Sequence, residues 1–340
     1  METPQVDAVV ERVEGGCHLS MAEMRDTIDR VMEGRFSDDQ IARLLLGLNR
    51  KGETVAEVAG AAAAMRKHVT PIRSRHTGIL DTCGTGGDGS KTFNISTAAA
   101  LVVAAAGVPV AKHGNRGVTS RSGSADVLAA LGVNIEASAS CVEACLDELG
   151  ICFCFAPLLH PAMKRVAAVR RRLGVPTIFN ILGPLANPAG ATYQLIGVGR
   201  AALRPLLAEA LAMLGTDRAV VVHGQDGMDE VSLSGPTDAT LVSEGRVAEL
   251  RWTPEQFALP RCRREDLTVE GPEQSAALIR GVLAGQRGPA RDVVLANAAA
   301  GLWTAGRVPS PAAGVDVAAN AIDCGAAALL LERLVARSNR

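Results

Sequence analysis

The pattern of apolar and polar positions divides the chain into a helical segment and a mixed segment. Over roughly the first 70 residues, apolar positions recur at helical spacing. Ile41, Leu44, Leu45 and Leu48, for example, fall on one face of a helix. Three capping boxes precede stretches of this pattern: Ser20 with Glu23, Ser37 with Gln40, and Thr54 with Glu57. These signals predict a small N-terminal domain built of helices.

From about residue 78, short apolar runs alternate with helical patterns. This alternation predicts an α/β domain with a mostly parallel sheet flanked by helices. The predicted strands are 79–82, 108–111, 151–155, 194–198 and 219–223. Between them, helices are predicted at 96–106, 124–131, 140–149 and 203–214, with Ser140 and Glu143 as a fourth capping box. Residues 240–250 predict an antiparallel hairpin that turns at Glu244 and Gly245, and helices are predicted again at 273–285, 290–305 and 314–336.

The segment 160–188 interrupts the alternation of strands and helices. It reads as a basic helix followed by a loop rich in Pro, Gly and Asn. We expect part of it, about 165–188, to pack on the N-terminal helices. The predicted organisation is a small helical domain of residues 1–72 joined by 165–188, and a larger α/β domain of residues 73–164 and 189–340.

Composition and charge narrow the possible functions. Of the 340 residues, 48% are hydrophobic and 21% charged, and the net charge of −1 argues against a general nucleic-acid binder. The eight cysteines lack the spacing of zinc sites, so we expect buried, reduced thiols. The N-terminal residues do not resemble a signal peptide, and the longest apolar run is interrupted by Ser, Thr, Gly and Pro. We therefore expect a cytoplasmic protein with no membrane-spanning segment.

A glycine-rich loop, DTCGTGGDGSKTFNIST at 81–97, lies between a predicted strand and a predicted helix. Such loops direct backbone N–H groups toward phosphates. Gly84, Gly86 and Gly89 match the G-x-G-x-x-G dinucleotide pattern, but the acidic residue expected about 20 positions later is missing. The Walker pattern also fails, because Lys91 comes one residue too late. A phosphate loop of another kind is predicted, and a purely structural turn is the alternative.

A second loop, KHGNRGVTSRSGSAD at 112–126, again connects a predicted strand to a predicted helix. It carries three cations and three hydroxyls: Lys112, Arg116 and Arg121, with Ser120, Ser122 and Ser124. This combination suits a phosphate or pyrophosphate, and a solvated basic loop is the alternative. Two such loops in successive βα units indicate one ligand with two phosphate groups, or two ligands.

Two further clusters carry charge. Arg170, Arg171 and Arg172 point in different directions on a helix, so at most two can face one site, where an arginine would suit a carboxylate. Asp229 and Glu230 follow a predicted strand at the edge where α/β sheets bind ligands, and such a pair suits Mg²⁺. Taken alone, each cluster is more often surface charge. Together with the two loops, they predict a magnesium-pyrophosphate site that acts electrostatically.

Seven motifs occur in the order and spacing of the anthranilate phosphoribosyltransferase family, and the resemblance covers nearly the whole chain. They are DTCGTGGDG, TFNIST, KHGNR, SGSADVL, HPAMK, FNILGPLANP and HGQDGMDE. The resemblance implies a helical domain, an α/β domain and an active site in the cleft between them. It implies transfer of phosphoribose from 5-phosphoribosyl-1-pyrophosphate (PRPP) to the amine of anthranilate in tryptophan biosynthesis. Two Mg²⁺ ions per subunit and a homodimer joined through the helical domain are also implied.

The resemblance also assigns residues to ligands. Those implied for PRPP are Gly84, Thr85, Gly86, Gly87, Asp88, Thr92, Asn94, Ser96, Thr97, Lys112 and Ser124. Those implied for anthranilate are Gly84, His113, Asn115, His160 and Arg170, and those for the metal are Ser96, Asp229 and Glu230. No single residue is implied as catalytic, although Asp88, Lys112 and Arg170 would support electrostatic catalysis.

Three positions depart from the family pattern behind the anthranilate site. Ala168, Arg172 and Pro176 stand where the family usually has Pro, Glu and a basic residue, which leaves the local helix packing and the role of Arg171 open. Two other functions share this architecture. KHGNR and Asp229-Glu230 fit a pyrimidine nucleoside phosphorylase-like enzyme poorly. A non-enzymatic nucleic-acid-binding relative would need a basic groove, and the near-neutral net charge and the carboxylate pair argue against it.

Overall fold

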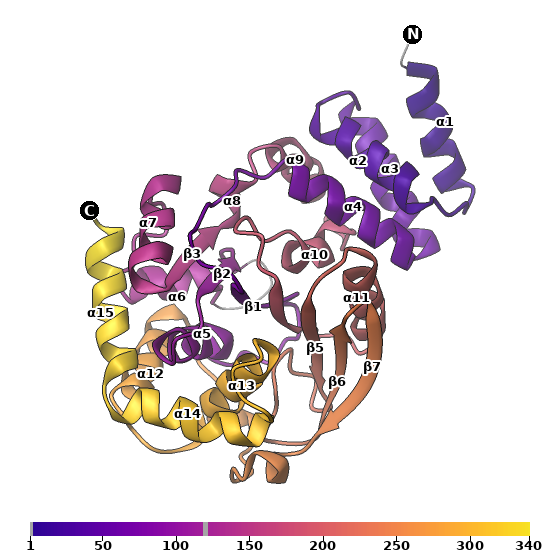
Figure 1. Ribbon diagram of the computed structural model, residues 1–340. Coiled ribbons are helices and arrows are strands. Elements are labelled where there is room, and N and C mark those ends of the chain that lie inside the picture. Colours follow the sequence, from indigo (N-terminus) through magenta and orange to yellow (C-terminus); the bar gives the residue numbers. More distant parts are fainter. Residues whose placement is uncertain (1–2, 118–121) are drawn as a thin grey trace.

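A computed structural model describes residues 3–117 and 122–340, so Ser120 and Arg121 of the second loop lie outside the described residues. The N-terminal segment folds into α1 (Thr3–Glu14), α2 (Met21–Met32), α3 (Asp38–Lys51) and α4 (Val55–Lys67). These helices form a bundle at the upper right of Figure 1, next to a larger α/β body. All three predicted N-terminal capping boxes are present, at Ser20, Ser37 and Thr54.

One seven-stranded sheet forms the centre of the α/β body within the described residues, in the order β3-β2-β1-β4-β5-β6-β7. The five strands β1 to β5 run parallel, and β6 and β7 add an antiparallel edge. Their bounds are β1 (Leu80–Gly84), β2 (Val110–Gly114), β3 (Ile151–Phe155), β4 (Tyr193–Gly197), β5 (Arg218–Gly224), β6 (Thr237–Ser243) and β7 (Arg246–Trp252). The predicted hairpin is confirmed, because β6 and β7 pair antiparallel and Glu244 and Gly245, between them, both have the positive φ of a type I′ turn.

Helices cover both faces of the sheet (Figure 1). Between the strands run α5 (Ile95–Ala105), α6 (Ser124–Ala130), α7 (Ala139–Leu149), α8 (Ala156–Leu159), α9 (Met163–Leu173), α10 (Phe179–Leu182) and α11 (Leu203–Met213). After the sheet come α12 (Pro272–Leu283), α13 (Pro289–Thr304), α14 (Pro311–Asp323) and α15 (Ala326–Ser338). Short 3₁₀ turns occur at Gly183–Leu185, Pro254–Phe257 and Arg264–Leu267.

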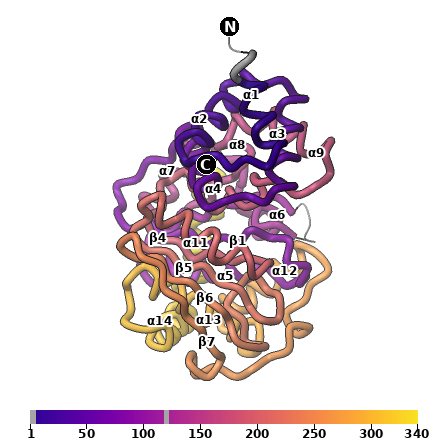
Figure 2. Tube along the Cα trace, turned by 90° about the vertical axis from the view of Figure 1, so that its right-hand side faces the viewer, coloured from indigo at the N-terminus to yellow at the C-terminus, as the bar shows by residue number. Residues whose placement is uncertain are grey.

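Two hydrophobic clusters lie on opposite faces of the sheet. Successive side chains of a strand point to opposite faces, so Val220 and Val222 of β5 join the cluster with α5 and α13, while Val221 joins the other cluster. That second cluster also holds the cores of the N-terminal helices and of residues 166–186, including Val166 and Phe179. Figure 2 shows α9 beside the N-terminal helices, and α9 contacts α3.

The structure corrects two details of the predicted helices. The N-cap of α7 is Ser138, whose side chain accepts a hydrogen bond from the Cys141 backbone N–H, so Ser140 and Glu143 do not form the predicted capping box. The predicted helix 314–336 is two helices, because α14 ends at Asp323 and Gly325, with φ of 78°, turns the chain into α15.

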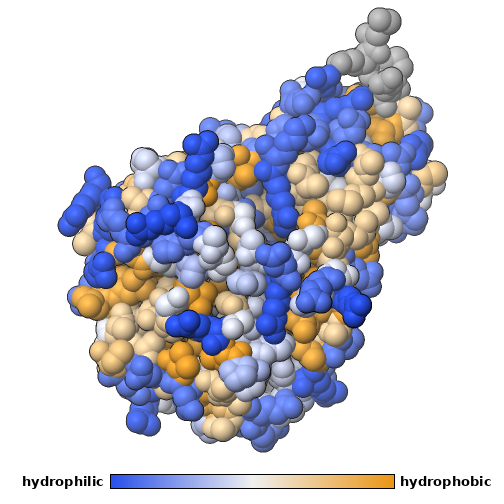
Figure 3. Space-filling model, viewed as in Figure 1, coloured by the Kyte–Doolittle hydropathy of each residue, from blue (hydrophilic) through white to orange (hydrophobic). Residues whose placement is uncertain are grey.

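The cysteines and the surface also differ in part from expectation. All eight cysteines are free thiols, but Cys17 and Cys324 are exposed and only four are buried. On the face shown in Figure 3, strongly hydrophobic residues occur in small groups separated by hydrophilic ones. Within the described residues, no single helix has the length and apolar character to cross a membrane; α14 and α15 meet that test only as a pair bent by 63°.

Candidate active site

A cavity of about 360 Å³ lies where β1, β2 and β5 end, and the loops that follow these strands form much of its wall. The carboxyl ends of parallel strands are the usual place for ligands in α/β sheets. Fifteen of the predicted site residues line it: Gly84, Thr85, Gly86, Gly87, Asp88, Thr92, Asn94, Ser96, Lys112, His113, Asn115, Ser124, Arg170, Asp229 and Glu230. Thus the structure brings together four clusters that are far apart in the sequence.

Two predicted residues, Thr97 and His160, do not line the cavity. Thr97 is fully buried on α5, and its Oγ1 has no hydrogen-bond partner among the residues that the structure describes. His160 lies behind His113 and is 6% exposed. The ligand contacts that the family resemblance implied for these two residues stay predictions.

The glycine loop is folded tightly against the carboxylate of Asp229. A Cβ atom on Gly84 would lie 2.5 Å from Asp229 Oδ2, so no larger residue fits there without a shift. The backbone N–H of Gly86 donates to the same oxygen at 3.1 Å. Gly86 itself has φ of 66°, a conformation in which glycine meets no steric penalty. One function of the glycines is therefore to let the glycine-rich loop pack against the Asp229-Glu230 pair.

Three carboxylates converge at this point: Asp88, Asp229 and Glu230. The backbone N–H of Asp229 donates to Asp88 Oδ2 at 3.5 Å, and Glu230 Oε1 accepts from the Ser96 N–H at the start of α5 at 3.0 Å. Burial and the charge of Asp88 raise the pKa of Asp229 to about 7. Burial and the charge of Asp229 raise the pKa of Glu230 to about 8. A cation placed here would relieve this repulsion.

The donor set fits magnesium held together with a phosphate ligand. The described residues include no group of three or more His, Cys, Asp or Glu side chains arranged to hold a metal alone. Mg²⁺ commonly takes one or two carboxylates and completes its shell with water and substrate phosphates. Asp229 and Glu230 supply such carboxylates, and the glycine loop beside them supplies room for phosphate.

Lys112 and His113 lie at a gap between β1 and β2, which pair only at Leu80 and Val110. Beyond that pair, hydrogen bonds between a side chain of one strand and the backbone of the other connect β1 and β2. The His113 backbone N–H donates to Asp81 Oδ1 at 3.0 Å. Lys112 Nζ donates to the Thr82 carbonyl and lies 3.2 Å from Ser96 Oγ. The gap thus places a buried cation beside the α5 N-terminus.

His113 and His160 form a neutral pair. His113 Nδ1 lies 3.0 Å from the Gly183 carbonyl, which can only accept, so this nitrogen carries the proton. His113 Nε2 is then an acceptor and receives the Nε2–H of His160 at 3.1 Å. Burial is the main cause that lowers the pKa of His113 to about 3, and the charge that His160 would carry when protonated lowers it further. Burial alone lowers the pKa of His160 to about 4. This arrangement leaves no proton acceptor on His113 for a substrate.

Of the three consecutive arginines, only Arg170 lines the cavity. Its NH2 group donates to Asn180 Oδ1 at 3.0 Å, and its guanidinium lies 5.9 Å from the centre of the Phe179 ring. Arg171 and Arg172 are exposed. The departures at Ala168 and Arg172 also lie on the exposed side of α9, while the Pro176 carbonyl accepts from Asn49 Nδ2 of α3 at 2.9 Å.

Asn94 joins separate loops at the cavity wall. Its Oδ1 accepts from Ser275 Oγ of α12 at 2.9 Å and from Ser122 Oγ at 2.8 Å. Its Nδ2 donates to the Ser122 carbonyl at 3.1 Å. Most of its hydrogen-bonding capacity therefore holds the protein together, a role that sequence reasoning did not assign.

Other residues of the cavity wall were not assigned to a ligand by the family resemblance, although Arg116 and Ser122 were among the phosphate candidates of the second loop. They are Cys83, Ser90, Lys91, Phe93, Gly114, Arg116, Gly117, Ser122, Gly123, Ala156, Phe179, Asn180, Gly183 and Pro184. Several stand next to predicted residues in the two loops, so proximity in the sequence was a usable signal for Lys91 and Arg116. Phe179, Asn180, Gly183 and Pro184 belong to the FNILGPLANP motif, whereas nothing in the sequence marked Ala156.

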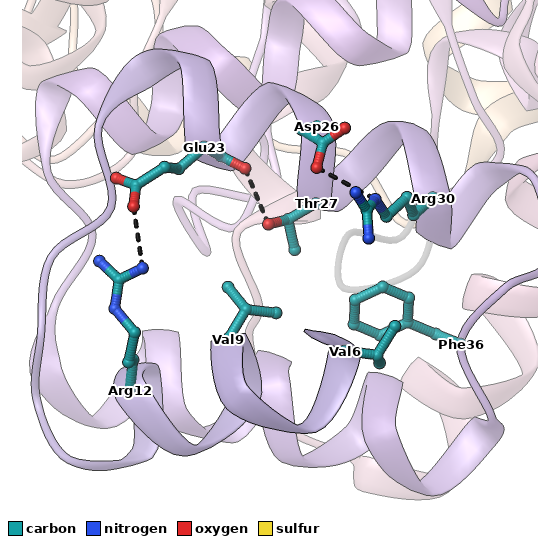
Figure 4. A pocket seen from close by; sticks show the side chains of 8 residues that line it. All are labelled: Val6, Val9, Arg12, Glu23, Asp26, Thr27, Arg30 and Phe36. Atoms are coloured by element: carbon teal, nitrogen blue, oxygen red, sulfur yellow. Dashed lines mark hydrogen bonds and ion pairs between the residues drawn. The ribbon is translucent and has the colours of Figure 1, made fainter. Parts of the chain in front are cut away.

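A second hollow, of about 190 Å³, lies between α1 and α2 (Figure 4). Val6, Val9 and Phe36 form its apolar side. Its charged groups are already paired, Arg12 with Glu23 at 2.8 Å and Arg30 with Asp26 at 3.0 Å. It holds none of the predicted chemistry.

Comparison with known proteins defines the class first. Residues 76–328 match the glycosyl transferase family a/b domain, and residues 7–69 match the helical bundle domain of the same family. The chain is therefore a glycosyl transferase with a helical bundle and an α/β domain, as the fold and the site indicate.

Individual relatives define the family more closely. The chain is 50% identical to anthranilate phosphoribosyltransferase of Rhodopirellula baltica, covering 96% of this chain and 95% of the relative. It matches the crystal structure of the Thermus thermophilus enzyme with a TM-score of 0.92 at 44% identity, covering 97% and 99%. The Saccharomyces cerevisiae enzyme in complex with PRPP and Mg matches with a TM-score of 0.89 at 27% identity, covering 99% and 98%. The chain belongs to the anthranilate phosphoribosyltransferase family, and the predicted fold class and family are confirmed.

Proposed function

We propose that this chain transfers the phosphoribosyl group of PRPP to the amine of anthranilate, in tryptophan biosynthesis. The observation that carries the proposal is the convergence of the glycine loop, Lys112, the Asp229-Glu230 pair and Arg170 on one cavity. A nucleoside phosphorylase would have no evident use for the carboxylate pair. A nucleic-acid-binding protein would have no evident use for a cavity enclosed between loops.

The proposed PRPP site is the half of the cavity formed by the two loops. The glycines from Gly84 to Gly87 let the pyrophosphate approach the backbone closely, although the Thr85 and Gly86 N–H groups already donate to the Gly197 carbonyl and to Asp229 Oδ2. Lys112 and Ser124 add a cation and a hydroxyl. Thr85, Asp88, Thr92, Asn94 and Ser96 complete the wall. Ser96, Asp229 and Glu230 would hold Mg²⁺, which we propose as two ions per subunit, and the bound metal would neutralise the charge that develops on the pyrophosphate.

The proposed anthranilate site lies toward α9 and α10, where Arg170, His113, Asn115 and Gly84 line the wall. Arg170 binds the carboxylate of anthranilate, and His160 acts only by orienting His113. In the reaction, the bond from ribose C1 to pyrophosphate breaks, a bond from the amine nitrogen to C1 forms, and the nitrogen releases a proton. An arylamine is neutral and nucleophilic at pH 7, so positioning and charge stabilisation carry the rate without a strong base.

Loss of anthranilate fluorescence tests the proposal directly. Purified protein is mixed with PRPP, Mg²⁺ and anthranilate, and turnover is followed with time. We expect turnover that depends on all three components. A folded protein that leaves the fluorescence unchanged would contradict the assignment.

Arg170→Ala is expected to raise the KM for anthranilate at least about tenfold, with little change in the KM for PRPP. The reason is that a charge-assisted hydrogen bond to a carboxylate contributes roughly 1.5–3 kcal/mol. Steady-state kinetics with each substrate varied in turn gives both constants. Arg171→Ala, one position along α9 and exposed, is the matched control and should leave both unchanged. Equal changes in the two KM values for Arg170→Ala would refute its role.

We also propose a homodimer joined through the helical domain, and the domain boundaries given above. Residues 166–186 share their hydrophobic cluster with the N-terminal helices, which supports a discontinuous helical domain. Leu46 of α3 and Val175 after α9 are large apolar side chains that stay 37% and 40% exposed on packed elements of this domain. Sedimentation equilibrium measures the mass in solution, and a dimer would have twice the mass of the chain.

We propose a cytoplasmic location, which imaging of the tagged chain tests.

A further inference from the structure

Lys91 has an unusual backbone conformation at the edge of the active-site cavity. Its φ is 58°, in the left-handed region that residues with a Cβ rarely adopt. Among the described residues, only Glu244 and Ala258 share this property without being glycine. Unfavourable conformations of this kind concentrate at functional sites, where the surrounding structure holds them in place.

A second segment of the chain holds Lys91 in this conformation. The Val269 N–H donates to the Lys91 carbonyl at 3.0 Å, and the Phe93 N–H donates to the Leu267 carbonyl at 2.9 Å. Phe93 and Leu267 are each 1% exposed. The chain is thus anchored directly after Lys91 by buried apolar side chains, and its backbone cannot relax independently.

The ammonium group of Lys91 is the uncommitted cation of the cavity, as far as the described residues show. Lys112, Arg116 and Arg170 also line the cavity, but each already binds a protein group: Lys112 the Thr82 carbonyl, Arg116 a carboxylate and Arg170 an amide. Lys91 is exposed, and it makes no side-chain hydrogen bond or ion pair with any residue that the structure describes. A lysine offers a compact charge with three donors, which suits phosphate oxygens.

We propose that Lys91 is a phosphate-binding residue of the PRPP site, and that its left-handed backbone is retained because it keeps the side chain at the cavity that the glycine loop also lines. This inference rests on the proposed function and adds a substrate contact to it. The competing explanation is an exposed lysine that only interacts with water and whose backbone strain is incidental.

Three variants separate the two explanations. Lys91→Asn removes the cation and relieves the strain, because Asn tolerates the left-handed region. Lys91→Arg keeps both the charge and the strain. Glu244→Asn is the matched control, because it relieves the same strain at φ of 53° in the β6–β7 hairpin, outside the cavity. For each variant, calorimetry measures PRPP binding with Mg²⁺ in the absence of anthranilate, and thermal unfolding gives the Tm.

We expect Lys91→Asn to raise the Tm by about 1–3 °C and to weaken PRPP binding about five- to tenfold. Lys91→Arg should keep PRPP binding within about threefold of the wild type, and its Tm should not rise. Glu244→Asn should raise the Tm with PRPP binding unchanged. The KM for anthranilate should stay within about twofold throughout.

Two results would overturn the inference. Lys91→Asn could bind PRPP as well as the wild type, or Lys91→Arg could bind it as weakly as Lys91→Asn, which would show that the charge is not used. Failure of the proposed function is recognised separately, because in that case the wild-type protein itself does not consume anthranilate.

Discussion

Asp229→Asn combined with Glu230→Gln is expected to abolish magnesium-dependent turnover, with a loss in kcat/KM of about a thousandfold or more. The variant keeps the volume of both side chains and an acceptor for the Gly86 N–H, but removes the charge that would hold the metal. Steady-state kinetics across a series of Mg²⁺ concentrations measures the loss. Glu244→Gln, an exposed acid in the β6–β7 hairpin, is the control for loss of charge alone.

The same double variant should be more stable than the wild type when Mg²⁺ is absent. In the folded protein the pKa of Asp229 is raised to about 7 and that of Glu230 to about 8, above the ordinary values of about 4. Carboxyls with raised pKa values stabilise the fold while protonated, and this stability is lost as pH rises from about 4 to about 8. The gap in unfolding free energy between variant and wild type should therefore widen over that window, on the order of a few kcal/mol.

Chemical denaturation at pH 5 and pH 8.5 measures this gap, and added Mg²⁺ with pyrophosphate should stabilise only the wild type. Retained turnover with unchanged metal dependence would show that the pair is surface charge. Lost turnover with a less stable metal-free protein would show that the carboxylates are structural.

Gly197→Ala is expected to reduce activity at least about a hundredfold and to destabilise the fold by roughly 1–3 kcal/mol. A Cβ atom on Gly197 would lie 1.6 Å from the Asp229 carbonyl oxygen and 2.4 Å from its carbon. These are backbone atoms, so the clash moves Asp229 itself away from the glycine loop. Because Gly84 pairs with Gly197 across β1 and β4, no space opens on that side.

Kinetics and thermal unfolding of Gly197→Ala test this expectation. Gly235→Ala is the matched control, because a Cβ there meets nothing within 4 Å, and its backbone φ lies outside the left-handed region. Wild-type activity and metal dependence in Gly197→Ala would mean that the position of Asp229 does not matter. A loss in both glycine variants would point to a general effect on the loop after β5.

Most of the elements followed from local patterns. The capping boxes at Ser20, Ser37 and Thr54 formed as predicted, because a cap is decided within four consecutive residues. The strands were found within a few residues, because buried parallel strands are short apolar runs between turn signals. Where two serines could cap the same helix, the prediction was wrong: Ser138, and not Ser140, is the N-cap of α7.

The chemistry of the site was accessible from the sequence because phosphate loops and carboxylate pairs follow strands, and parallel strands end at one edge of a sheet. Contacts between distant segments were not accessible. No local pattern indicates that His160 donates to His113, that Ser275 of α12 binds Asn94, or that residues 267–269 hold Lys91.

The sequence by itself therefore determined the order of helices and strands, the class of ligand and the family. Only the tertiary structure decided which of the candidate residues line the cavity. Arg170 lines the cavity whereas Arg171 and Arg172 do not, and Thr97 and His160 lie away from the cavity wall. Asp229 packs closely against Gly84 and Gly197. The physical reason is range: caps and periodicity act over a few residues, whereas burial and charge at a site depend on side chains brought together from the whole chain.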